Sequence, residues 1–302
     1  MKKILSTTCL LLMVIAGFTQ EIRIATYRYS TNDRVANLEP FAKLVEQKTG
    51  FRTTVKSYPT VLAFIEGIRN NEVDLAMINT FGYLLLQTSA KPYPMDPAVA
   101  LTVPPSSKDN YKTAILTRSN SMIKDMATLN RSAKDQRLAL VAVGSTSGNL
   151  VPRLGLTGIG IDKAESAFDT VVYAGTHKAA IEWLLQDKAD IAAMGHDAYL
   201  KMAQEEPAIE GQLRTIWLSP EIPLGPVLFH KSIDPKLKET LLQLLLGLHT
   251  SQPEALTSIK NGWTEAKQAT HYITIQANHY FPFLQQFGKP EAVAAILEQF
   301  AN

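Results

Sequence analysis

The sequence is almost free of cysteine. Cys9 is the only one among 302 residues, and it lies in an N-terminal apolar segment that we expect to be removed. The remaining chain would contain no thiol, which excludes disulfides, thiolate metal sites and cysteine nucleophiles together. Stability must therefore come from packing of a hydrophobic core, and 46% of the residues are hydrophobic.

An excess of charge of either sign is also missing. The chain has 30 basic and 28 acidic residues, and without Lys2 and Lys3 of the N-terminal segment both counts are 28. No run of Lys or Arg is present. We therefore expect no long-range attraction to nucleic acid or to an anionic membrane. An anion that this protein binds must be held by local groups.

The one long apolar run is short for a membrane span. Residues 4–18, ILSTTCLLLMVIAGF, follow Lys2 and Lys3 and precede the polar strand-like segment EIRIATY. This order predicts a signal peptide over residues 1–19 and hence a periplasmic or otherwise extracytoplasmic protein. An uncleaved membrane anchor is the alternative.

Short apolar runs alternate with helical patterns along the rest of the chain. The first series has strands EIRIATY, FRTTVKSY and VDLAMIN, and the second has RLALVAV, FDTVVYAG and ADIAAMG, each followed by a helical segment. This alternation predicts an α/β protein in which two α/β units, each a mostly parallel sheet flanked by helices, stand in tandem.

The two series resemble each other in sequence. IEGIRNNEVDLAMIN from Ile65 and IEWLLQDKADIAAMG from Ile181 share Ile, Glu, Asp and Ala at one constant offset of 116 residues. Asp74 and Asp190 both fall between a helix and an apolar strand. The pattern indicates an internal repeat, although two generic α/β units can match by chance.

Hydroxyl side chains dominate the turns that follow the predicted strands. Open parallel sheets bind ligands at the carboxyl ends of their strands, so two facing sheets predict a site in the cleft between them. The turns in question are Tyr27 to Ser30, Tyr58 to Val61, Asn79 with Thr80, Ser145 to Gly148, Gly175 to His177, and His196 with Asp197.

The turn GSTSGNLVP, residues 144–152, has the most pronounced pattern. Pro152 is tolerated only in the first turn of a helix, so we expect that helix to begin near Asn149. Its first N–H groups would then open beside three hydroxyls, and neutral donors alone could hold an oxyanion without a cation. The alternative is a Ser or Thr helix cap, which needs only one hydroxyl.

These residues resemble a known family. GSTSGNLVP, FDTVVYAGTHKAAI, WLSPEIPLGPVLFHK and the later NGW are similar to the periplasmic phosphate-, phosphite- and phosphonate-binding components of ABC importers. The resemblance implies a two-lobed type II periplasmic binding protein with two crossover strands as its hinge. It implies lobe 1 over residues 20–119 and 222–302 and lobe 2 over 120–221, with crossings near 116–121 and 219–224.

The resemblance also implies a site and a transport function. Ser145, Thr146, Ser147 and the N–H of Gly148 would meet a phosphorus oxyanion, and His177 would add a donor, although a half-buried helix-capping histidine is the alternative for it. The remaining predicted ligand-binding residues are Tyr29, Tyr58, Asn79, Thr80 and Asp197. Relatives that bind aminoalkylphosphonates offer two carboxylates to the ammonium group. Here Asp197 matches one and Gly225 replaces the other, which favours phosphate, phosphite or a simple alkylphosphonate.

Two other function classes stay open. A sensory module would dock on a membrane sensor instead of an ABC permease, and an enzyme could use the same two-lobed fold. The nucleophile pattern G-x-S-x-G fails here because Gly144 is three residues before Ser147. We therefore predict a monomeric binding protein that needs no cofactor or metal and binds no nucleic acid.

Overall fold

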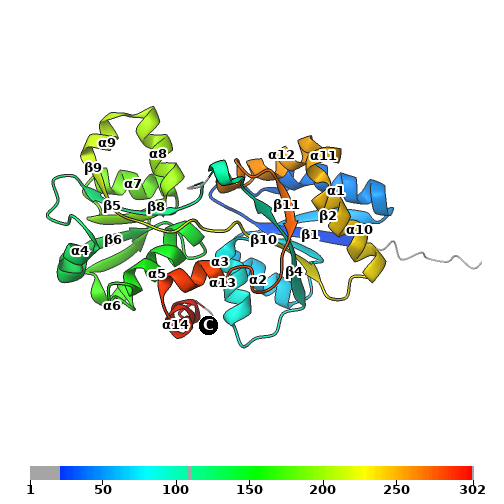
Figure 1. The fold of residues 1–302 in the computed structure, drawn as a ribbon, viewed down its shortest axis with the longest axis horizontal. Helices are drawn as coiled ribbons and strands as arrows, with labels where there is room; N and C mark the ends of the chain where they lie inside the picture. Colours follow the sequence, from blue (N-terminus) through cyan, green and yellow to red (C-terminus); the bar gives the residue numbers. More distant parts are fainter. Residues whose placement is uncertain (1–20, 108–109, 301–302) are drawn as a thin grey trace, which may run out of the picture.

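The structure, a computed structural model, describes residues 21–107 and 110–300. Two lobes lie side by side, each built on one sheet with helices on both faces (Figure 1). The predicted signal peptide, residues 1–19, lies outside the described residues. Within the described part, no helix has the length and apolar character needed to cross a membrane.

The first lobe contains a six-stranded sheet in the order β11-β4-β10-β3-β1-β2. Its strands are β1 Glu21–Tyr27, β2 Arg52–Tyr58, β3 Leu75–Met77, β4 Met95–Thr102, β10 Pro226–His230 and β11 His271–Thr274. Its helices are α1 Val35–Thr49, α2 Val61–Arg69, α3 Thr80–Thr88, α10 Pro235–Leu246, α11 Leu248–Ser251, α12 Pro253–Asn261, α13 Phe281–Leu284 and α14 Pro290–Glu298.

The second lobe contains a five-stranded sheet in the order β7-β6-β8-β5-β9. Its strands are β5 Thr113–Arg118, β6 Arg137–Leu140, β7 Thr170–Tyr173, β8 Ile191–Gly195 and β9 Leu213–Leu218. Its helices are α4 Met126–Ser132, α5 Val151–Thr157, α6 Ala164–Ala167, α7 His177–Leu185, α8 His196–Glu205 and α9 Ala208–Gln212, and a π-turn over Thr146–Leu150 precedes α5.

Both sheets are mixed. Strands β2, β1 and β3, and likewise β7, β6 and β8, pair in parallel, as the sequence predicts. The other pairings are antiparallel, because β4, β5, β9 and β10 border the segments that cross between the lobes. The parallel half of each sheet therefore carries the strand-to-helix turns that face the other lobe.

The crossing segments run together between the lobes. They connect β4 to β5 and β9 to β10, and the N–H of Ile222 donates to the carbonyl of Tyr111 at 2.7 Å. The return crossing lies where we expected it. The outward crossing lies before β5, which pairs in the second sheet, whereas the sequence-based division kept residues up to 119 in the first lobe.

The internal repeat is present in three dimensions. Helices α2 and α7 both have nine residues, and Thr60 and Thr176 cap them by accepting a hydrogen bond from the residue three positions on. Asp74 and Asp190 then bind Arg23 and Arg137 through the same set of backbone and side-chain nitrogens. The helix lengths, the threonine caps and the aspartates match at the offset of 116 residues, and the arginines at 114, which goes beyond a chance match of two generic units.

The C-terminal residues contact both lobes. Helix α14 lies below the junction in Figure 1 and is followed by Phe300, whose ring meets Phe81 of α3 at 5.4 Å. The same ring lies 5.3 Å from the guanidinium of Arg153 in α5, and Gln299 donates to the carbonyl of Asp162. The C-terminal residues thus connect the two lobes in addition to the two crossing segments.

Candidate functional site

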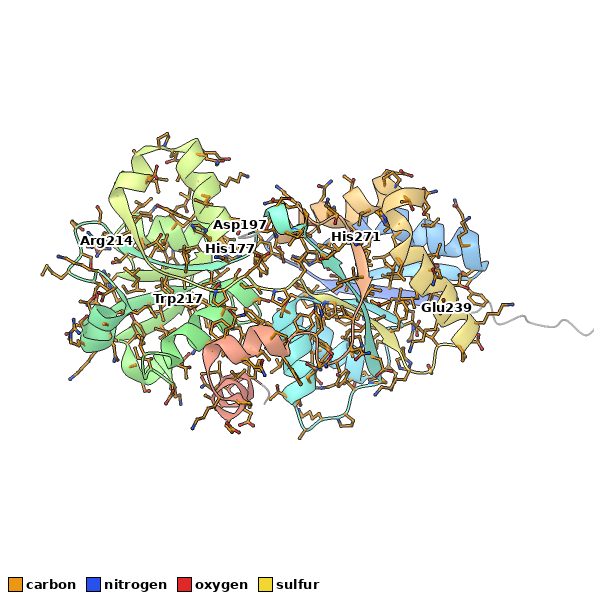
Figure 2. The ribbon with its side chains drawn as sticks, viewed as in Figure 1. His177, Asp197, Arg214, Trp217, Glu239 and His271 are labelled. Carbon is orange, nitrogen blue, oxygen red and sulfur yellow. The ribbon has the colours of Figure 1, made fainter. Side chains whose placement is uncertain are left out.

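A cavity of about 490 Å³ lies between the lobes. The strand-to-helix turns of both sheets line it, as the architecture of open α/β sheets predicts. The predicted residues that line it are Tyr29, Asn79, Ser145, Thr146, Ser147, His177 and Asp197. Figure 2 shows His177 and Asp197 on the second lobe at the junction with the first.

The hydroxyl turn is a helix cap and a donor array at the same time. The π-turn starts at Thr146, three residues before the predicted helix start, and Ser145 caps it by accepting the N–H of Gly148 at 3.0 Å. Thr146 accepts the N–H of Phe81 from the first lobe at 3.1 Å. In both bonds the hydroxyl oxygen accepts, so its own hydrogen remains available to donate. Pro152 lies in the first turn of α5, as predicted.

Three polar side chains converge above Gly195 at the end of β8. A Cβ atom at this glycine would lie 2.6 Å from Asp197 Oδ1, 3.4 Å from Ser147 Oγ and 3.6 Å from His177 Cε1. The glycine therefore leaves space where these side chains meet. All three line the cavity, so a small group placed there could contact two or three of them.

The protonation state of His177 follows from its surroundings. Its Nδ1 accepts the backbone N–H of Gly195 at 3.0 Å, which leaves the proton of the neutral ring on Nε2. Burial lowers the pKa of His177, and the nearby Asp197 acts in the opposite direction. The ring is thus held as a neutral hydrogen-bond donor.

Tyr29 faces this cluster from the first lobe. Its ring centroid lies 5.8 Å from that of His177. Burial raises the pKa of Tyr29 to about 12, and a hydrogen bond with the backbone of His177 acts in the opposite direction. A second interlobe bond joins Asn79 Nδ2 to the carbonyl of Gly144 at 2.8 Å. The lobes are therefore in direct contact around the cavity.

Three predicted residues do not line the cavity. Tyr58 donates to Glu72 at 2.6 Å and packs on Gly67, away from the other lobe. Thr80 donates to the carbonyl of Pro223 in the return crossing. Gly148 uses its N–H on Ser145, and its missing Cβ makes room for Val141 instead of a ligand.

The expectation of a cavity without cations is wrong, because Arg28 and Arg34 both line it. Arg34 precedes α1, outside any apolar pattern, and sequence periodicity gives no sign of where its side chain points. Glu265 also lines the cavity, and burial raises its pKa while Arg34 opposes that shift. The motif NGW, residues 261–263, directly precedes Thr264 and Glu265 and is the only signal that could have pointed to them.

Comparisons with known proteins agree with this architecture. The family described as "ABC transporter, phosphonate, periplasmic substrate-binding protein" matches residues 25–272. The Phosphonates-binding periplasmic protein of Escherichia coli (strain K12) is 24% identical over 74% of this chain, but the match spans only 64% of that protein. The Phosphate-import protein PhnD of Mycolicibacterium smegmatis is 24% identical over 74% of this chain and 71% of its own length.

A solved structure gives the fold. PhnD1 from Prochlorococcus marinus, in complex with methylphosphonate, superposes with a TM-score of 0.65 at 16% identity, covering 89% of this chain and 97% of that one. The two-lobed architecture described above is thus the type II periplasmic binding protein fold.

Proposed function

This chain belongs to the family of periplasmic substrate-binding proteins of phosphonate ABC transporters, and from that premise we propose that it captures a small phosphorus oxyanion in the cavity between its lobes. The ligands that we propose are phosphate, phosphite or a simple alkylphosphonate. The protein would act outside the cytoplasmic membrane as a monomer and would deliver its ligand to an ABC permease.

The convergence of Ser147, His177 and Asp197 above Gly195 is the observation that carries this proposal. Ser147 and the neutral His177 supply hydrogen-bond donors, and the start of the π-turn adds N–H groups that have no acceptor inside the helix. Oxyanions are bound by donors of this kind, and each charge-assisted bond contributes about 1.5–3 kcal/mol.

Asp197 favours phosphorus over sulfur. An ionised carboxylate only accepts hydrogen bonds, so it repels a fully deprotonated oxyanion but accepts the P–OH of a singly protonated one. Phosphoryl groups lose their second proton near pH 6 or above, whereas sulfonates carry no such proton at neutral pH. A site that contains Asp197 beside its donors should therefore discriminate against sulfonates.

The arrangement does not support the hydrolase alternative. In a Ser–His–Asp triad, the acid accepts a hydrogen bond from Nδ1–H of the histidine. Here Nδ1 of His177 accepts a hydrogen bond from Gly195, so Asp197 cannot orient the ring in that way. A binding role fits these contacts better than nucleophilic catalysis.

Closure of the lobes would provide the signal that a membrane partner recognises. The bonds Asn79 to Gly144 and Phe81 to Thr146 join the lobes beside the cavity, so closure and the shape of the site are coupled. A membrane sensor that reads the same closed form is the alternative partner. Neighbouring genes for an ATPase and a permease would favour uptake, and a sensor kinase would favour signalling.

Titration calorimetry tests the ligand class directly. We expect binding of phosphate, phosphite or methylphosphonate, and at least about tenfold weaker binding of sulfate and methanesulfonate. Ser147→Ala should weaken binding of the phosphorus ligand by about 1–3 kcal/mol without lowering the melting temperature equally. Binding of sulfonates in preference to every phosphorus compound would contradict the proposal.

A further inference from the structure

Arg34 is a buried cation whose acidic neighbour in the cavity wall, Glu265, does not form an ion pair with it. Arg34 is 4% exposed, yet it forms no ion pair with any other residue that the structure describes. Its Nε donates to the carbonyl of Gly262 at 2.7 Å and its Nη1 to the carbonyl of Tyr27 at 3.0 Å. Carbonyl oxygens orient a guanidinium, but they do not neutralise its charge.

Another buried arginine shows the usual solution. The side chain of Arg153 is 2% exposed and forms an ion pair with Glu165. A buried charge is normally compensated in this way, because desolvation of an unpaired ion costs several kcal/mol. Arg153 packs away from the cavity, whereas Arg34 lines it. The difference suggests that the anion for Arg34 comes from the ligand.

The backbone of Arg34 also carries strain. Its φ of 64° and ψ of 3° place it in the left-handed region, which a residue with a Cβ adopts only at a cost. The side chain of Asn32 accepts its N–H at 2.8 Å. The guanidinium then lies 4.4 Å from the ring centroid of Tyr27 and 4.6 Å from that of Trp263, so aromatic faces fix its plane.

Tyr29 connects this group to the predicted oxyanion site. Its ring lies 5.8 Å from the guanidinium of Arg34 and 5.8 Å from the ring of His177. Arg34 and His177 are therefore neighbours of the same ring, so a ligand that binds above Gly195 and extends past Tyr29 would approach Arg34. The cavity of about 490 Å³ is within the usual range for small organic ligands, so it has room for more than an inorganic anion.

We propose that Arg34 binds a second acidic group of the ligand, so that the preferred ligand is a phosphonate that bears a carboxylate on a short alkyl chain. This inference rests on the proposed function and specifies the ligand within the same cavity. A carboxylate is chosen because one guanidinium matches one negative charge, whereas a second phosphoryl group would bring up to two. The rings of Tyr27 and Trp263 hold the guanidinium in one plane, and a planar guanidinium matches the geometry of a carboxylate.

The other charged groups around the cavity are compatible with this ligand. Glu265 lies on the same lobe as Arg34, and burial raises its pKa while Arg34 opposes that shift. Asp197 is on the opposite lobe beside His177, where the phosphonate would bind. Arg28 is exposed and adds positive charge at the same wall.

Matched ligand pairs test the inference by calorimetry. Phosphonoacetate is compared with ethylphosphonate, and 3-phosphonopropionate with propylphosphonate, since each pair differs by a carboxylate in place of a methyl group. We expect the wild-type protein to bind at least one carboxylate-bearing member about ten- to a hundredfold more tightly than its partner. Equal affinities within both pairs, or a preference for the alkyl member, would overturn the inference.

Variants of the two cavity arginines locate the effect. Arg34→Gln should abolish the preference and change ethylphosphonate affinity by less than about threefold, whereas Arg34→Lys should keep part of it. Arg28→Gln removes the other cation of the cavity wall and, because that side chain is exposed, should lower the preference less than Arg34→Gln. An equal loss for both ligands in Arg34→Gln, or loss of the preference only in Arg28→Gln, would contradict the role of Arg34.

Even if Arg34→Gln fails to fold, the ligand comparison in the wild-type protein still tests whether a carboxylate on the ligand is preferred. Failure of this inference is also distinct from failure of the proposed function. If alkylphosphonates bind without a preference for the carboxylate, only the role of Arg34 is wrong. If no phosphorus compound binds, the proposed function itself is wrong, and the role of Arg34 is wrong with it.

Discussion

The two lobes use the same local scaffold for different chemistry. Helices α2 and α7 begin after equivalent threonine caps, but their first residues are Val61 and His177. Val61 supplies apolar surface that lies close to Gly144, and His177 supplies a hydrogen-bond donor. The second lobe thus contributes neutral donors, and the first contributes Arg34, with its aromatic neighbours, and Glu265. Repetition of a backbone unit fixes where a residue lies, and the residue at that position decides what it binds.

The largest difference between the lobes should be in the stability of their equivalent ion pairs. Asp190 binds Arg137 and Arg118, whereas Asp74 binds the side chain of Arg23 alone among the residues that the structure describes. We expect Asp190→Ala to lower the free energy of unfolding by about 3 kcal/mol and Asp74→Ala by about 2 kcal/mol, because the first removes a carboxylate that two arginines share and leaves them only the exposed Asp187. Urea denaturation measures both, and a larger loss in Asp74→Ala would contradict this ranking.

The contrast between Val61 and His177 should be evident in binding. We expect His177→Val, which makes the second lobe resemble the first, to weaken oxyanion binding by about 1.5–3 kcal/mol, since it removes the Nε2–H donor. His177→Gln should recover part of that affinity because its amide can donate. Val61→Ala removes apolar surface of the cavity but no donor, so it should weaken oxyanion binding less than His177→Val. Calorimetry that finds His177→Val and wild type equal would remove His177 from the site.

The equivalent caps should differ in binding but not in stability. Thr60→Ala and Thr176→Ala each remove one acceptor for a helix N–H and should each cost about 1 kcal/mol of unfolding free energy. Thr176→Ala should weaken ligand binding more than Thr60→Ala, because α7 carries His177, although Thr60 itself lines the cavity. Equal losses of affinity in both variants would show that the lobes contribute symmetrically.

The smallest expected effect is the pH dependence of stability. Burial lowers the folded-state pKa of His177 below its unfolded value of about 6.5, so the unfolded chain binds more protons between these values. The stability contributed by the neutral ring is present above about pH 6.5 and is lost as the pH falls. His230 and His279 have lowered pKa values too, so thermal melts of wild type and His177→Gln must be compared. Identical pH profiles of stability in wild type and His177→Gln would contradict the lowered pKa of His177.

Much of the fold could be predicted from patterns within short segments of the sequence. The matching segments around Asp74 and Asp190 predict the repeat, and Pro152 places the first turn of α5. The outward crossing was placed one strand late because β5 is an apolar run whose partner strands, β8 and β9, are distant in sequence. Sheet membership depends on such long-range pairing, which periodicity does not reveal.

Residues of the candidate site could be predicted where the backbone fixes the direction of the side chain. They could not be predicted where packing fixes it. Ser147 and Asp197 lie at strand-to-helix turns and line the cavity as expected. Tyr58 also ends a strand, but Gly67 leaves space for its ring on the far side and Glu72 accepts its hydroxyl. The direction of Arg34 depends on its left-handed backbone and on Trp263, more than 200 residues away.

The C-terminal contact limits how the two lobes can separate. Phe300 touches Phe81 on one lobe and Arg153 on the other. Separation that keeps this contact must widen the opposite edge, so the amplitude of opening is set by how far the aromatic ring can slide over its two neighbours. Truncation of the chain before Gln299 should therefore increase the range of angles sampled by the unliganded protein, a change that small-angle X-ray scattering would register as a larger radius of gyration.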